Sequence, residues 1–127
     1  NFNQKDSFGI SVLEKILNAE NRKALNLVRD FEFEYSPELD SAYENISDEN
    51  FKLSVKDLKI KFSHAIDAVR IDSAKALKIA IKEFDSPLCD KNKEVKNLLD
   101  FYHSNTRHYG ASAGVMQVME VFENERL

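Results

Sequence analysis

The stretch "DENFKLSVKDLKIKFSHAIDAV", residues 48–69, decides the fold class. Its apolar residues recur at steps of three and four positions, the spacing of one face of an α-helix. Asp48, or Ser47 before it, supplies the side-chain acceptor that typically begins a helix. The pattern therefore predicts one long amphipathic helix, with a buried stripe made of Phe51, Val55, Leu58, Phe62, Ala65, Ile66 and Val69.

Three more helices are expected downstream of this stretch. The first follows a cap at Asp72 or Ser73, the second follows Asp90, and the third begins near Ala111. Each repeats the spacing of three and four positions between apolar residues. Their buried residues are expected to be Ala74, Leu77, Ile81 and Phe84, then Val95, Leu98, Leu99 and Tyr102, and finally Val115, Val118, Met119 and Phe122.

Upstream, a first helix is expected to begin near Asp6 or Ser7. Its apolar stripe is Ile10, Leu13, Ile16 and Leu17. Helix is expected to continue through "RKALNLVRDFEFEY", residues 22–35, although "FEFEY" also alternates as a strand does. Helix is preferred there because a single strand would have no partner. Ser36 as cap and Pro37 at the first helical position then predict a short helix.

Composition supports a helical bundle. The 127 residues contain only 3 glycines and 2 prolines, fewer than a β-sandwich or barrel needs for its turns. We therefore expect one all-α domain over residues 1–127, a bundle of five or six helices. The chain begins with Asn rather than Met, so we expect it to be a piece of a longer protein.

Several classes of protein are excluded by the same totals. Cys89 is the one cysteine, so no internal disulfide can form, which fits a reducing compartment. No apolar run reaches the length of a membrane span, and no signal peptide is recognisable. We therefore expect a cytoplasmic protein with no membrane contact. No metal-ligand spacing and no glycine-rich phosphate loop is present, so neither a metal nor a cofactor is expected.

The charged residues are unevenly distributed, although the net charge is only −4. Residues 30–49 hold eight acidic residues and no Lys or Arg, whereas residues 51–96 hold eleven basic and seven acidic residues. The two segments form separate solvated faces, or they meet in a dimer or against a protein partner. Two lysine stripes are likewise open to two interpretations, the wet side of a helix or a phosphate-binding surface: Lys52, Lys56 and Lys59, and Lys75, Lys78 and Lys82.

Proton-active and flexible residues concentrate in "HSNTRHYGASAG", residues 103–114, which we interpret as a loop between two helices. Arg107 offers a planar cation that suits phosphate, and His103 and His108 can transfer protons near neutral pH. His103 and Arg107 would share a face if the preceding helix reached that far. With Asn105 as a hydrogen-bonding group, this set fits metal-independent cleavage of RNA. The alternative is a polar connector whose Arg and His cap helix ends.

The segments "DSAKALKIAIKEF" and "NTRHYG" together resemble the HEPN superfamily of small α-helical domains found in bacterial abortive-infection, antiviral and toxin systems. The resemblance covers roughly residues 51–122. It implies a homodimer with a metal-independent RNase site at the dimer interface. Arg107 would hold the phosphate, and His108 would be the polar residue that follows it. From their residue types, we expect Asn105, Lys75, Lys78 and Lys82 to contact the RNA substrate.

One departure from the family pattern leaves two functions open. Ser112, Ala113 and Gly114 stand where active members place their second histidine. Either His103 or His108 does the proton transfer, in a ribonuclease of a defence or toxin system, or the domain is a non-catalytic dimerisation and protein-interaction module. In the second case the acidic residues 30–49 are the expected binding surface.

Overall fold

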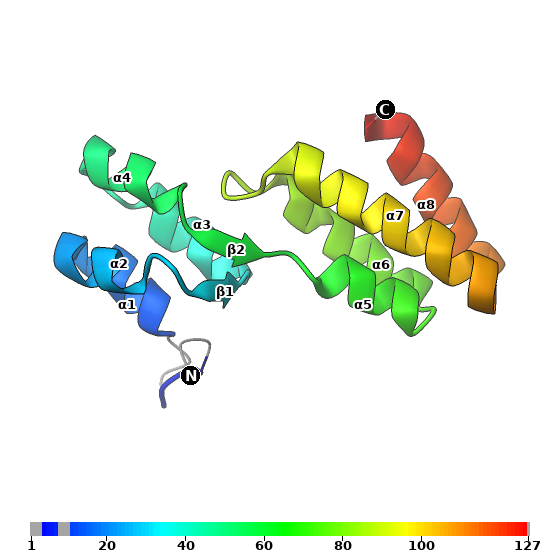
Figure 1. Cartoon of the computed structure of the whole chain (residues 1–127), viewed down its shortest axis with the longest axis horizontal. Helices are drawn as coiled ribbons and strands as arrows, with labels where there is room; N and C mark the ends of the chain where they lie inside the picture. The colour runs from blue at the N-terminus through cyan, green and yellow to red at the C-terminus, as the bar shows by residue number, and fades with distance from the viewer. Residues whose placement is uncertain (1–3, 8–10, 127) are drawn as a thin grey trace. The chain divides into compact units, whose positions relative to one another are not determined.

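The computed structural model describes residues 4–7 and 11–126, and these are mostly helical, as the sequence predicts (Figure 1). The described residues form eight α-helices, one 3₁₀ helix and one pair of three-residue strands. They divide into two compact units, residues 1–61 and 62–127, which are described separately below. The expectation of a single domain over residues 1–127 stays a prediction.

The first unit contains four short helices and both strands. Along the chain these are α1 (Val12–Ala19), α2 (Arg22–Val28), β1 (Glu32–Glu34), α3 (Pro37–Glu44), α4 (Glu49–Val55) and β2 (Lys59–Lys61). Helix α1 packs against α2 and α3. The side chains that the unit buries most completely are Leu13, Leu17, Leu25, Phe33, Leu39, Phe51 and Val55.

Helix α1 begins later than the sequence pattern indicates. Its cap is Ser11, not Asp6 or Ser7, and the predicted start is wrong. The Ser11 hydroxyl accepts from the Glu14 N–H while the Glu14 carboxylate accepts from the Ser11 N–H, which is a capping box. Ile10, expected in the apolar stripe, lies outside the described residues.

Residues 32–34 form a strand, so the prediction of helix through "FEFEY" is wrong. Their partner is Lys59–Lys61, which pairs with them in parallel register, Phe33 opposite Ile60. The predicted helix over residues 48–69 is therefore also wrong, because it is divided into α4, β2 and α5. Pairing across the fold overrides the local helical spacing. The apolar stripe is nevertheless buried as expected, except that Ile66 is half-buried.

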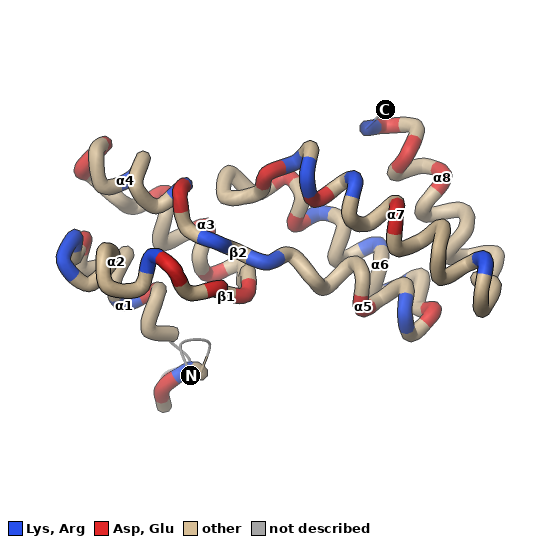
Figure 2. The backbone as a smooth tube through the Cα atoms, in the orientation of Figure 1, with Lys and Arg blue, Asp and Glu red and all other residues tan. Residues whose placement is uncertain are grey.

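The strand pair also brings acidic and basic residues together. The register places Glu32 opposite Lys59 and Glu34 opposite Lys61. Figure 2 shows the acidic β1 and the basic β2 side by side. Part of the charge asymmetry between residues 30–49 and residues 51–96 is therefore balanced within the first unit.

The second unit is a bundle of four α-helices and one 3₁₀ helix: α5 (His64–Arg70), α6 (Ala74–Ala80), η1 (Ile81–Asp85), α7 (Lys91–Tyr109) and α8 (Ala113–Arg126) (Figure 1). Helix α6 packs against α5 and α8, and α7 packs against α5 and η1. Phe84 and Phe122 meet edge to face in the core, with ring centroids 5.5 Å apart. A Cβ at Gly114 would lie 3.1 Å from the Cβ of Ala74, so the missing side chain lets α8 approach α6.

The predicted starts of α3, α4, α6 and α7 are confirmed. Asp48, Ser73 and Asp90 each accept a backbone N–H of the helix that follows them, and Pro37 opens α3. Helix α8 begins at Ala113, two residues after the predicted position. Within the described residues, no helix combines the length and the apolar character needed to cross a membrane.

Candidate functional site

Residues 103–109 and 113–114 are helical, so the interpretation of residues 103–114 as a loop is wrong except for residues 110–112. Helix α7 runs for 19 residues, and Gly110, with a φ of 75°, ends it. The Gly110 N–H donates to the Thr106 carbonyl at 2.8 Å. Polar side chains do not end a helix when they point to solvent, whereas a positive φ does, and glycine adopts it without strain.

The extended helix places His103 and Arg107 one turn apart. At about 100° per residue, they lie about 40° apart around the helix axis. Both side chains are exposed. We expected His103 and Arg107 to share a face if the helix continued this far, and the structure confirms this prediction. A guanidinium group and an imidazole group therefore stand together on the exposed surface of α7.

His108 lies on a different part of the helix surface. It is exposed, about 100° from Arg107 and about 140° from His103 around the axis. A single copy of α7 consequently cannot direct both histidines at one phosphate. One copy presents one histidine beside Arg107.

Asn105 faces the opposite side of α7 from His103 and Arg107 and lines an open groove of about 770 Å³. The groove lies between the end of α5, the last turns of α7 and the connection to α8. Its lining comprises Val69, Arg70, Asp72, Phe101, Asn105, Tyr109, Gly110, Ala111 and Ser112. The structure therefore separates Asn105 from the arginine with which the sequence grouped it.

The lysines grouped with the site lie on α6 and η1. Lys75 and Lys78 belong to α6 and Lys82 to η1, and all three are exposed on the face that also carries Ile79. In the part of the chain that the structure describes, no ion pair joins them to an acidic side chain of α7. The other proposed stripe does not lie on one helix, because Lys59 belongs to β2.

Cys89 is not a nucleophile at neutral pH. Burial, together with the neighbouring carboxylates of Glu94 and Asp90, raises the pKa of its thiol to about 12. The described residues contain no group of three or more His, Cys, Asp or Glu side chains placed to hold a metal ion.

His64 is an exposed helix residue, as the sequence predicts, but its partner was not foreseen. Its Nδ1 lies 2.8 Å and 3.0 Å from the two carboxylate oxygens of Glu83. Glu83 belongs to η1, far from His64 in sequence, and no local pattern could indicate the contact. The pair links the start of α5 to η1.

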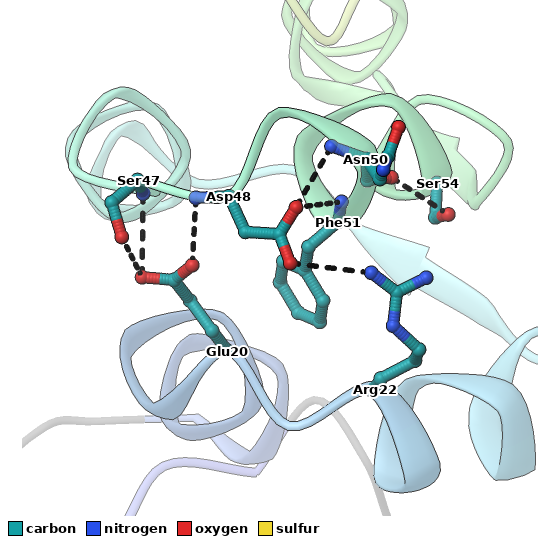
Figure 3. A network of polar contacts seen from close by, with 7 residues as sticks. All are labelled: Glu20, Arg22, Ser47, Asp48, Asn50, Phe51 and Ser54. Atoms are coloured by element: carbon teal, nitrogen blue, oxygen red, sulfur yellow. Dashed lines mark hydrogen bonds and ion pairs between the residues drawn. The ribbon is translucent and has the colours of Figure 1, made fainter.

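A second polar cluster, in the first unit, is structural. Glu20, in the left-handed conformation after α1, accepts from the Ser47 hydroxyl and from the Asp48 N–H, both at 2.9 Å (Figure 3). Asp48 accepts from the first N–H groups of α4 and pairs with Arg22 at 3.3 Å. These contacts lower the pKa of both carboxyl groups. Every group in the cluster has a partner within it, so it holds α1, α2 and α4 together.

Comparison with known proteins identifies no relative: no family model, curated protein or solved structure matches the chain. The resemblance to the HEPN superfamily therefore stays a prediction from the residues quoted above.

Proposed function

We propose that the chain is an HEPN-like helical domain of a bacterial defence or toxin system that cleaves RNA without a metal ion. The observation that carries the proposal is the continuation of α7 to Tyr109, which sets His103 beside Arg107 on an exposed face. Arg107 binds the scissile phosphate, and His103 transfers a proton.

The proposed reaction needs two proton-transfer groups. A base removes the proton of the ribose 2′-hydroxyl, whose oxygen attacks the phosphorus as the 5′-oxygen leaves. An acid protonates the leaving 5′-oxygen, and the products are a 2′,3′-cyclic phosphate and a 5′-hydroxyl. Arg107 stabilises the negative charge on the phosphate oxygens in the transition state. His103 and His108 of one copy are about 140° apart, so the two groups come from two copies, and we propose a homodimer.

Cleavage of a labelled RNA pool in EDTA tests the proposal. His103→Ala and Arg107→Ala are each expected to reduce the rate by about 100-fold or more, the usual contribution of such groups. His64→Ala is the matched control, since it removes another exposed histidine from the same unit. His108→Ala shows whether the second histidine acts as well.

Two outcomes would overturn the proposal. One is the absence of cleavage by a wild-type sample whose circular dichroism shows a folded helical protein. The other is cleavage that persists unchanged in Arg107→Ala and His103→Ala, because the activity would then come from elsewhere.

A non-catalytic interaction module is the second candidate, and exposed apolar side chains favour it. Ile71 and Ile79 are 70% and 61% exposed, and both belong to the second unit. Exposed apolar groups that cluster often mark protein interfaces. If RNA is not cleaved and light scattering shows a dimer that Ile79→Glu dissociates, the interaction module is the better description.

A further inference from the structure

The groove between α5, α7 and the α7–α8 connection has the composition of a ligand site. Phe101 and Tyr109 supply aromatic rings. Tyr109 is 85% exposed although it is a large aromatic residue. The Asn105 amide, which is half-buried, has no hydrogen-bond partner among the described residues, and its donors and acceptor are available to a ligand.

The charged groups of the groove are already engaged. Arg70 pairs with Asp67 at 2.9 Å, and its guanidinium lies 5.3 Å from the centre of the Phe101 ring. Asp72 accepts the Ser112 N–H at 3.0 Å. One cation and one anion line the groove, so it carries no net charge to attract a phosphate or a carboxylate. A neutral, planar ligand with hydrogen-bonding edges fits it better.

We propose that this groove binds one unpaired base of single-stranded RNA. The base stacks on Tyr109, and its edge hydrogen-bonds to the Asn105 amide, the combination by which proteins commonly hold unstacked bases. The groove's volume of about 770 Å³ lies within the range of sites for small organic ligands.

The position of the groove connects it to the proposed cleavage site. Asn105 and His108 are three residues apart, about 60° around the helix axis. His108 lies between Asn105 and Arg107 around the axis, so a strand whose base occupies the groove reaches Arg107 if it leaves the groove on the His108 side. This inference rests on the proposed function, and it specifies the substrate as single-stranded RNA held by a base outside the cleavage site.

Binding can be measured separately from cleavage. The probe is a short fluorescein-labelled single-stranded RNA with 2′-O-methyl riboses, which cannot be cut because the attacking hydroxyl is blocked. Tyr109→Ala is expected to weaken binding by about 5- to 150-fold, the effect of losing one stacked base. Tyr109→Phe keeps the ring and should bind as the wild type does. Val121→Ala, which shortens an exposed apolar side chain outside the groove, is the control.

Further measurements separate the base from the phosphates. Replacing one nucleotide at a time by an abasic one should weaken wild-type binding at one position of the probe. It should weaken Tyr109→Ala binding less at that position, because the stacking contact is already absent and only the contact with Asn105 is left to lose. The salt dependence of binding should be the same for both proteins, since no phosphate contact is lost.

Equal binding by the wild type and Tyr109→Ala, or no binding of the probe at all, would overturn this inference. The proposed function can fail independently of this inference. RNA binding that depends on Tyr109, without any cleavage, would support the base-binding groove and refute the nuclease. Cleavage that needs Arg107 and His103 but is unchanged in Tyr109→Ala would support the nuclease and refute the base-binding groove.

Discussion

Truncation of Phe33 to alanine tests the strand pair most directly. Phe33 is the central residue of β1 and is only 1% exposed. Removing a fully buried phenylalanine side chain typically costs about 3–5 kcal/mol. A unit of about 60 residues has an unfolding free energy of about 3–9 kcal/mol. Phe33→Ala is therefore expected to remove about a third or more of the stability of the first unit.

Phe31 supplies the matched control, two residues earlier. It is 47% exposed, so Phe31→Ala loses only about half the burial free energy of a phenylalanine, about 1 kcal/mol. The same substitution at the two positions should thus differ by about 2 kcal/mol or more. Phe33 lies within β1 and is buried, whereas Phe31 precedes the strand and is half-exposed.

Equilibrium unfolding in urea, followed by far-ultraviolet circular dichroism and tyrosine fluorescence, measures both variants. The chain has no tryptophan, and the buried Tyr35 and Tyr43 report on the first unit. With a slope of about 1–3 kcal/mol per molar urea, the expected loss moves the midpoint by about 1 M or more. A loss in Phe33→Ala no larger than in Phe31→Ala would refute the reasoning, and the helix first expected at this segment would regain support.

Two further substitutions address the second unit. Gly114→Ala is expected to lower the midpoint of thermal unfolding, with a loss of about 1 kcal/mol from crowding against Ala74. Adding Ala74→Gly to this variant should relieve the crowding and raise the midpoint again. A higher midpoint for Gly114→Ala alone would show that α6 and α8 move apart without cost. Glu94→Gln is expected to stabilise at pH 7, because burial raises the pKa of Glu94 above its ordinary value of 4.5. A carboxyl group with a raised pKa stabilises the fold fully below pH 4.5 and loses that contribution as the pH rises through its folded pKa. The stability gained by Glu94→Gln, measured by urea unfolding, should therefore shrink on acidification. An equal gain at pH 7 and at pH 4 would contradict burial as the cause.

The parts of the fold that could be predicted are those fixed by neighbours in sequence. Asp48, Ser73 and Asp90 cap helices through N–H groups two or three residues away, so their chemistry is visible locally. The strand pair could not be predicted in this way. Lys59–Lys61 fits a helical spacing by itself, and only its pairing with Glu32–Glu34 makes it a strand.

The candidate site shows the same limit. The residue types of His103, Arg107 and His108 pointed to proton transfer and phosphate binding, but their relative directions depend on whether the segment is helical. The interpretation of residues 103–114 as a loop allowed His103 and His108 to point at the same phosphate. The helix separates them, and it turns Asn105 and Tyr109 into the groove.

The charges on the two strands restrict which chains can pair with which. A second copy that added its β1 beside β1 would set glutamate against glutamate, and β2 beside β2 would set lysine against lysine, both unfavourable. Only a β1 with a β2 matches opposite charges. Addition of like strands is thus discouraged, whereas a β2 edge that meets the β1 edge of another copy, or a strand exchanged between two copies, keeps the matched charges. At high concentration during folding, pairing of β1 with the β2 of another copy is therefore the error that this sequence is least protected against.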